Sequence, residues 1–185
     1  MILSEHPCAP DPAEAAPLVA AEYLRRGVSQ ADGQLIRRLE FIGQPAVPAV
    51  FDALVRSAAE GRIRLADVDL AAALPQATRH ALDRDAPERF TLPSRRTAAI
   101  DYRDNGPFVA VKLQELFGVL DSPRIGRRRV PLTFELLAPN GRPVQVTSDL
   151  RSFWTRGYPE VRKELRGRYP KHKWPEDPNG RQFKI

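Results

Sequence analysis

Arginine and lysine side chains are the residues of this chain whose type and spacing best fit a chemical task, the binding of phosphate groups. Residues 1–123 contain 14 basic and 17 acidic residues, whereas residues 124–185 contain 15 basic and 6 acidic residues. The net charge of +6 therefore comes wholly from the last third of the chain. A cationic surface attracts the phosphate backbone of nucleic acids, although the same charges are also compatible with an ordinary solvated face.

The candidate nucleic-acid-binding residues lie on expected loops and in the C-terminal segment. Arginine binds phosphate through several N–H donors, and aromatic rings beside it can stack on bases of a single strand. Tyr102 and Phe108 are the candidates for such stacking. The same basic residues could instead be solvated loop charges or contact a protein. The candidate cations are Arg95, Arg96, Lys112, Arg127, Arg128, Arg129, Arg142, Arg166, Arg168 and Lys171.

Sequence motifs for catalysis are absent from this chain. It contains no G-x-x-x-x-G-K-[S/T] string, which would hold nucleotide phosphates, and no Asp-Glu-x-His string, which would organise magnesium. The three histidines are far apart and the single cysteine has no partner, so no zinc site is expected. Asp101 and Asp104 are better explained as turn formers than as an acid–base pair. We therefore predict no catalytic residue, no metal ligand and no cofactor, and whether the chain takes part in an enzyme is left open.

Five short strands are expected to hold the basic loops, because apolar residues there alternate with polar ones. A helical turn is expected at residues 114–117, and Pro139-Asn140-Gly141 predicts a hairpin because Asn and Gly tolerate positive φ angles. Three strands, a short helix and two strands are the order of a five-stranded OB-like antiparallel β-barrel, predicted here at residues 87–147. In such barrels the first and last hairpin loops flank the nucleic-acid face. A generic five-stranded sheet is the alternative. The expected strands are 90–92, 97–102, 108–113, 130–137 and 144–146.

Residues 17–86 are predicted to form an N-terminal helical bundle, which makes the fold class α+β. Pro17 is expected to open the first helix, and Ser29 with Asp32 is typical of a capping box at the start of the second. Residues 1–16 are rich in proline, alanine and acidic residues and are predicted to be a disordered leader.

Residues 148–185 are predicted to form C-terminal helices followed by an irregular, basic, proline-rich strap. Ser148 is expected to cap the first of these helices, Gly157 to end it and Pro159 to open the next. Phe153, Trp154 and Tyr158 recur at helical spacing and are expected in the core.

The strap at residues 169–175 is expected to be anchored by its aromatic residues. Tyr169 and Trp174 can fix it either on its own domain, which is the default, or on a partner surface. His172 is compatible with a phosphate donor or a buried hydrogen-bonding residue, and the second interpretation is favoured.

The composition indicates a cytoplasmic protein that does not enter a membrane. A single cysteine, Cys8, cannot form an internal disulfide. No apolar run approaches the roughly 20 residues needed to span a bilayer, and the N-terminus lacks the basic start and apolar core of a secretion signal.

Five ordered strings of sequence share one resemblance. They are APER at residues 86–89, VKLQELFG at 111–118, VQVTSDL at 144–150, GRYPKH at 167–172 and WPEDP at 174–178. Together they resemble the C-terminal region of HrpB-type ATP-dependent helicases, a bacterial branch of the DEAH-box group, over about residues 65–178. An OB domain follows a helical bundle in DEAH-box helicases, so the resemblance implies the fold that the strand order predicts.

The resemblance implies a non-catalytic C-terminal accessory domain of an ATP-dependent RNA helicase. Such a domain would bind single-stranded RNA or DNA, brace a helicase core in cis or in trans, or do both. The basic loops could therefore contact nucleic acid or dock onto the core. The alternative is a stand-alone protein–protein interaction module, derived from that domain, whose basic surface binds an acidic partner.

Overall fold

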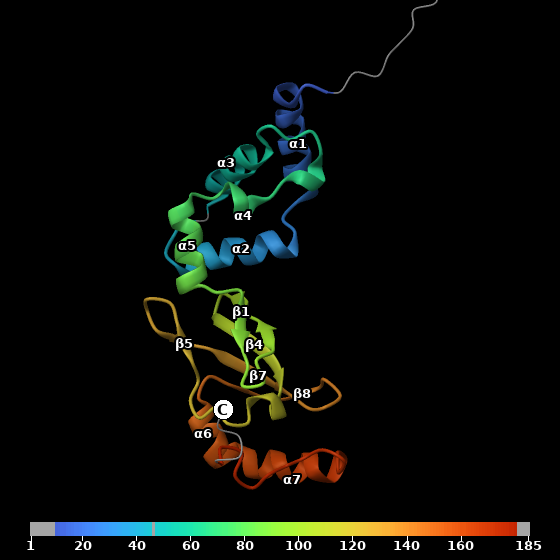
Figure 1. Ribbon diagram of the computed structural model, residues 1–185, viewed down its shortest axis with the longest axis vertical. Helices are drawn as coiled ribbons and strands as arrows, with labels where there is room; N and C mark the ends of the chain where they lie inside the picture. Colours follow the sequence, from blue (N-terminus) through green and yellow to red (C-terminus); the bar gives the residue numbers. More distant parts are fainter. Residues whose placement is uncertain (1–9, 46, 181–185) are drawn as a thin grey trace, which may run out of the picture. The chain divides into compact units, whose positions relative to one another are not determined.

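The computed structural model describes residues 10–45 and 47–180, and contacts divide the chain into two units, Met1–Ala81 and Leu82–Ile185. Figure 1 shows helices in the first unit and sheets followed by further helices in the second. The division falls inside a helix, five residues before the end of the bundle expected from the sequence. None of the helices in the described part of the chain is long and apolar enough to cross a membrane.

The first unit is helical and begins earlier than the sequence predicts. Asp11 caps the first helix, since its Oδ1 accepts a hydrogen bond of 2.9 Å from the N–H of Ala13. Pro17 therefore lies inside this helix instead of opening it, and residues 12–16, expected in the disordered leader, are helical. Residues 1–9 of that leader lie outside the described residues. The elements are α1 (Pro12–Arg26), α2 (Gln30–Phe41), α3 (Pro48–Ala59), the 3₁₀ turn η1 (Leu65–Asp67), α4 (Leu70–Ala73) and α5 (Gln76–Asp85).

The predicted capping box at the start of α2 is confirmed. The N–H of Asp32 donates to Ser29 Oγ at 3.1 Å, and the N–H of Ser29 donates to Asp32 Oδ2 at 3.2 Å. Tyr23 Oη of α1 also donates to the buried Asp32 carboxylate, at 3.0 Å from each oxygen. This carboxylate therefore joins α1 to α2.

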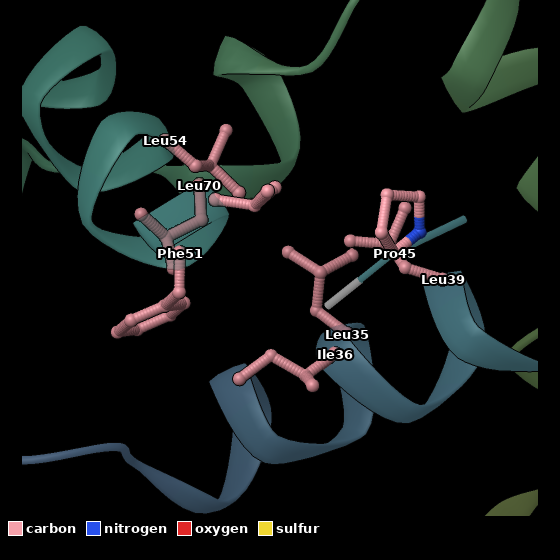
Figure 2. Close-up of a pocket in the computed structure, with 8 residues that line it drawn as sticks. Leu35, Ile36, Leu39, Pro45, Phe51, Leu54 and Leu70 are labelled. Atoms are coloured by element: carbon pink, nitrogen blue, oxygen red, sulfur yellow. The ribbon is translucent and has the colours of Figure 1, made fainter. Parts of the chain in front are cut away.

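A small apolar pocket lies between α2, α3 and α4. Figure 2 shows Leu35 and Leu39 of α2 facing Leu54 of α3 and Leu70 of α4 across it. Its volume is about 20 Å³, which is room for roughly one water molecule, and its walls offer that water almost no polar partner. The pocket is a packing gap between helices and provides no group for chemistry.

The second unit contains an open mixed sheet and two short ribbons, and its described residues form no closed barrel. The strand order is β3-β4-β7-β8 in the main sheet, with β1 pairing β2 and β5 pairing β6. The predicted OB-like five-stranded antiparallel barrel is therefore not what the structure contains. The strands are β1 (Arg89–Thr91), β2 (Thr97–Ala99), β3 (Asp101–Arg103), β4 (Gly106–Lys112), β5 (Arg124–Ile125), β6 (Val130–Pro131), β7 (Thr133–Leu137) and β8 (Pro143–Thr147).

The segment between β4 and β7 explains why the sheet is mixed. It contains the 3₁₀ helix η2 (Leu113–Leu116) and the β5–β6 hairpin, which falls where the sequence predicts a loop over most of its length. Parallel strands need a crossover of a dozen residues or more, and this connection supplies one. As a result β7 lies parallel to β4, with Phe108 opposite Thr133 and Lys112 opposite Leu137.

The helices after the sheet are one continuous helical run with a wide turn in its middle. The run comprises α6 (Leu150–Ser152), a π-helical turn η3 (Phe153–Gly157) and α7 (Tyr158–Arg168). Asp149, not Ser148, caps it, because Asp149 Oδ1 accepts a hydrogen bond of 2.9 Å from the N–H of Ser152.

Gly157 is the last residue of η3 and Pro159 lies in the first turn of α7, as predicted, but the backbone of Gly157 stays in the right-handed helical region, so the helix does not break there. Pro159 lacks an N–H, and in a regular α-helix its ring would clash with the carbonyl of Thr155. The π turn widens the helix at this point and accommodates the ring.

Four aromatic rings form the core between these helices and η2. The rings of Phe117, Phe153, Trp154 and Tyr158 lie with centroids 5.0–6.3 Å apart. Trp154 Nε1 donates to the carbonyl of Val119 at 2.7 Å. Burial raises the pKa of Tyr158 to about 12. The predicted core role of Phe153, Trp154 and Tyr158 is confirmed.

The strap is anchored on its own unit, as its aromatic residues predict. Trp174 is buried, and its Nε1 donates to the carbonyl of Tyr169 at 3.0 Å. Tyr158 Oη donates to the carbonyl of Pro175 at 2.8 Å, and Arg162 Nε donates to the carbonyl of Trp174 at 2.9 Å. His172 is exposed, so its expected burial is wrong.

Candidate nucleic-acid interface

The cations predicted from the sequence are all exposed, and the structure separates them into three groups. The basic rim consists of Arg95, Arg96, Lys112 and Arg142. The arginine tip consists of Arg127, Arg128 and Arg129. The terminal group consists of Arg166, Arg168 and Lys171.

The main sheet brings two members of the basic rim to one edge. Lys112 is the last residue of β4 and lies opposite Leu137 of β7. Leu137 in turn pairs with Pro143 of β8, which directly follows Arg142. Two strand spacings, about 10 Å, therefore separate the backbones that carry the two cations.

The β1–β2 hairpin adds Arg95 and Arg96 to the same edge. The N–H of Leu92 donates to the carbonyl of Arg96 at 2.8 Å, which closes the turn that presents both arginines. Arg96 Nη1 lies 2.8 Å from Glu115 Oε1, and Glu115 belongs to η2, which follows β4 without a gap. The rim therefore gathers at the carboxyl end of β4.

Charge compensation is uneven within the rim. Arg96 is paired with Glu115. Within residues 10–45 and 47–180, the side chains of Arg95, Lys112 and Arg142 form no ion pair. These three cations are therefore available to an anion from outside the chain.

The arginine tip lies at the other end of the sheet. Its hairpin leads into the start of β7, where Thr133 pairs with Phe108 near the start of β4. Arg127 Nε lies 3.3 Å from Asp85 Oδ2, and a hydrogen bond from Arg84 to the same carboxylate holds the pKa of Asp85 below its usual value. A seven-residue β4 is about 20 Å long, so tip and rim are separate surfaces.

The terminal group lies on α7 and on the strap. Arg168 Nη2 lies 3.3 Å from Glu164 Oε1 in an exposed pair, which holds the side chain only weakly. Gln114 Nε2 of η2 donates to the carbonyl of Lys173 at 3.1 Å. The strap thus passes beside the helix that follows the rim.

The predicted stacking residues are not accessible. Tyr102 is 1% exposed, and its Oη donates to the carbonyl of Pro87 at 2.8 Å. Phe108 is 8% exposed and is covered by the guanidinium of Arg103, whose Cζ lies 4.3 Å from the ring centroid. The sequence alternation places these rings correctly on strands but does not show that other side chains cover them. Arg103 is not among the residues predicted from the sequence.

Two of the predicted arginines have a backbone conformation that favours glycine. Arg95 has a φ of 64° and Arg129 a φ of 51°, and each closes a hairpin turn through its N–H. A non-glycine residue in this region costs about 1–3 kcal/mol. Glycine at either position would therefore relieve the backbone strain of the turn.

The neighbouring residues Arg128 and Arg129 allow a matched stability test. Arg129→Gly should raise the free energy of unfolding by about 0.5–1 kcal/mol, because relief of strain exceeds the added freedom of the unfolded chain. Arg128 has no positive φ in the described structure. Arg128→Gly should therefore lower the free energy of unfolding by about 0.4–1 kcal/mol. Urea unfolding followed by tryptophan fluorescence measures both. Changes of the same sign would contradict the assignment of strain to Arg129.

Comparisons with known proteins agree with one another. Residues 51–178 match the family model HrpB_C, described as ATP-dependent helicase C-terminal. The ATP-dependent RNA helicase HrpB of Escherichia coli (strain K12) is 51% identical over 98 residues, which are 52% of this chain and 12% of that protein.

Two solved structures also match this chain. The crystal structure of the E. coli DExH-box NTPase HrpB has a TM-score of 0.74 and 32% identity, over 94% of this chain and 24% of that one. The crystal structure of the E. coli DEAH/RHA helicase HrpB has a TM-score of 0.59 and 35% identity, over 79% of this chain and 21% of that one. The chain thus spans about a quarter or less of the relatives it matches.

Proposed function

Because the chain belongs to the HrpB_C family of ATP-dependent helicase C-terminal domains, we propose that it is a non-catalytic accessory domain that binds single-stranded nucleic acid through the basic rim. Its sequence contains no nucleotide-binding P-loop, which supports a role without ATP hydrolysis of its own. The motor that it serves would be a helicase core in cis or in trans. A cytoplasmic setting belongs to this proposal.

The observation that carries the proposal is the gathering of Arg95, Lys112 and Arg142 at one end of the sheet without ion-pair partners in the described part of the chain. Unpaired surface cations repel one another, and a phosphate chain removes that repulsion while releasing its own counterions. They come from three separate elements, which suits a strand that crosses the edge. The strap beside η2 extends the basic surface with Lys171 and Lys173.

Bracing of a helicase core is the second candidate function, and the first unit supplies the observation that favours it. Large apolar side chains are 40–72% exposed there, and a contact with another protein would remove them from water. The two functions are compatible because they use different units. The exposed apolar residues are Leu18, Val28, Val47, Val50 and Ile63.

Titration of a fluorescently labelled single-stranded RNA of about 15 nucleotides at several salt concentrations tests nucleic-acid binding. Three phosphate contacts predict that log K falls against log salt with a slope of about −2. Polyglutamate of equal charge serves as the control for an acidic protein partner, and it should bind more weakly at every salt concentration. Absence of RNA binding at 50 mM salt, or equal binding of polyglutamate, would overturn the proposal.

A further inference from the structure

We propose that the Arg103 guanidinium forms a stacking platform for one nucleobase on the open face of the main sheet. This inference rests on the proposed function and names the part of the ligand, a base and not a phosphate, that the face recognises. The platform consists of Arg103, the ring of Phe108 beneath it, and the carboxylates of Asp101 and Glu135 at its sides.

Strand register places the platform residues on one face. Asp101 lies opposite Phe108, and Arg103 lies opposite Gly106, which shares a face with Phe108 because alternate residues point the same way. Ala110, two residues further along β4, lies opposite Glu135. The other face carries the buried Val109 and Val111.

Contacts fix the plane of the guanidinium. Arg103 Nε donates to Asp101 Oδ2 at 2.5 Å, and Arg103 Nη1 donates to Glu135 Oε1 at 2.6 Å. Its Cζ lies 4.3 Å from the centroid of Phe108. The two charge-assisted hydrogen bonds occupy edges of the guanidinium, and the Phe108 ring covers one of its faces. The Arg103 side chain is still 37% exposed, so the other face is open to solvent.

The charges around Arg103 favour a base over a phosphate. The group combines one guanidinium with two carboxylates, so its formal charge is negative and it does not attract an anion. A planar guanidinium held in place can still stack on a base, which is neutral. Next to this group the same face also has two exposed apolar residues, Ala110 on β4 and Val146, which lies opposite Glu135 on β8.

The platform and the basic rim are within reach of one nucleic-acid strand. Lys112 shares the face with Phe108 and lies four residues along β4, a distance of about 13 Å. A strand with stacked bases covers this in roughly four nucleotides. A nucleic-acid strand whose phosphates bind the rim would therefore have a base next to Arg103.

Two oligomers with the same number of phosphates separate base from phosphate recognition. One is single-stranded RNA of about 15 nucleotides, and the other is an abasic oligomer of the same length. The wild-type protein should bind the base-bearing oligomer about tenfold more tightly, with equal salt slopes for the two. Arg103→Lys keeps the charge but removes the planar guanidinium. It should therefore reduce the preference for the base-bearing oligomer to less than about threefold without changing the salt slope.

Arg151→Lys is the matched control. Arg151 also makes two hydrogen bonds to a carboxylate, at 2.7 and 2.8 Å to Asp121, but the described structure shows no ring beneath it. This variant should retain the wild-type preference, and tryptophan fluorescence should show that both variants fold. If Arg103→Lys does not fold, the wild-type comparison decides, because equal binding of the two oligomers overturns the platform by itself.

The outcomes separate this inference from the proposed function. A salt-dependent RNA affinity without base preference, or a preference that Arg103→Lys retains, overturns the platform and leaves phosphate binding intact. Failure of both oligomers to bind overturns the proposed function. Loss of the preference in Arg103→Lys and not in Arg151→Lys supports the platform.

Discussion

Replacing Trp154 with alanine should lower the free energy of unfolding of the second unit by about 3–5 kcal/mol, as expected for removal of a buried tryptophan. The side chain is 7% exposed and contacts the rings of Phe117, Phe153 and Tyr158. Its Nε1 satisfies the carbonyl of Val119, which would lose its partner. These contacts hold the helical run against η2, so the loss should spread over the end of the sheet that carries the rim.

Urea unfolding measured by fluorescence suits this prediction, because both tryptophans of the chain lie in the second unit and Trp174 remains as the probe. Trp154→Phe keeps most of the buried surface. It should lower the free energy of unfolding by about 1–3 kcal/mol, mainly because the carbonyl of Val119 loses its hydrogen-bond donor. Arg156→Ala, an exposed position in the same π turn, should change stability by less than about 0.5 kcal/mol. A loss below about 1 kcal/mol for Trp154→Ala would contradict the core role of the ring.

Several signals of short range in the sequence predicted the structure correctly, although Pro17, Ser148 and Gly157 did not act as their local patterns predicted. The box formed by Ser29 and Asp32 depends on residues three positions apart. The hairpin at Pro139-Asn140-Gly141 depends on a glycine, which has a φ of 86°. The aromatic stripe at Phe153, Trp154 and Tyr158 depends on helical spacing. In each case the chemistry that decides the conformation lies within a few residues.

Features of long range could not be predicted in the same way. Residue alternation places β4 and β7 as strands but does not say that they pair in parallel, because that depends on the 20-residue segment between them. The same alternation does not reveal that Arg103 covers Phe108, since Arg103 belongs to a neighbouring strand. Sequence therefore predicts the strands β4 and β7 and the exposure of the candidate cations, but not the β5 strand or the division of the cations into three groups.

Reversing the charge of the three unpaired rim residues should have the largest effect on nucleic-acid binding. The variant Arg95→Glu, Lys112→Glu, Arg142→Glu should bind single-stranded RNA about a hundredfold or more weakly at 50 mM salt, and its salt slope should be smaller by about 2. Arg96 is left unchanged because its ion pair with Glu115 holds the β1–β2 hairpin. All three positions are exposed, so the free energy of unfolding should change by less than about 1 kcal/mol.

The terminal group provides the matched variant, because Arg166→Glu, Arg168→Glu, Lys171→Glu changes the net charge by the same amount. Long-range electrostatics alone would weaken binding equally in both variants, whereas direct contact at the rim should make its effect at least tenfold larger. Fluorescence anisotropy with the same RNA measures both. Equal losses would mean that the whole basic surface attracts the strand without a defined site, and a larger loss in the terminal variant would move the site to α7 and the strap. A dominant rim effect would place the phosphates beside the open sheet face, where a base can reach Arg103.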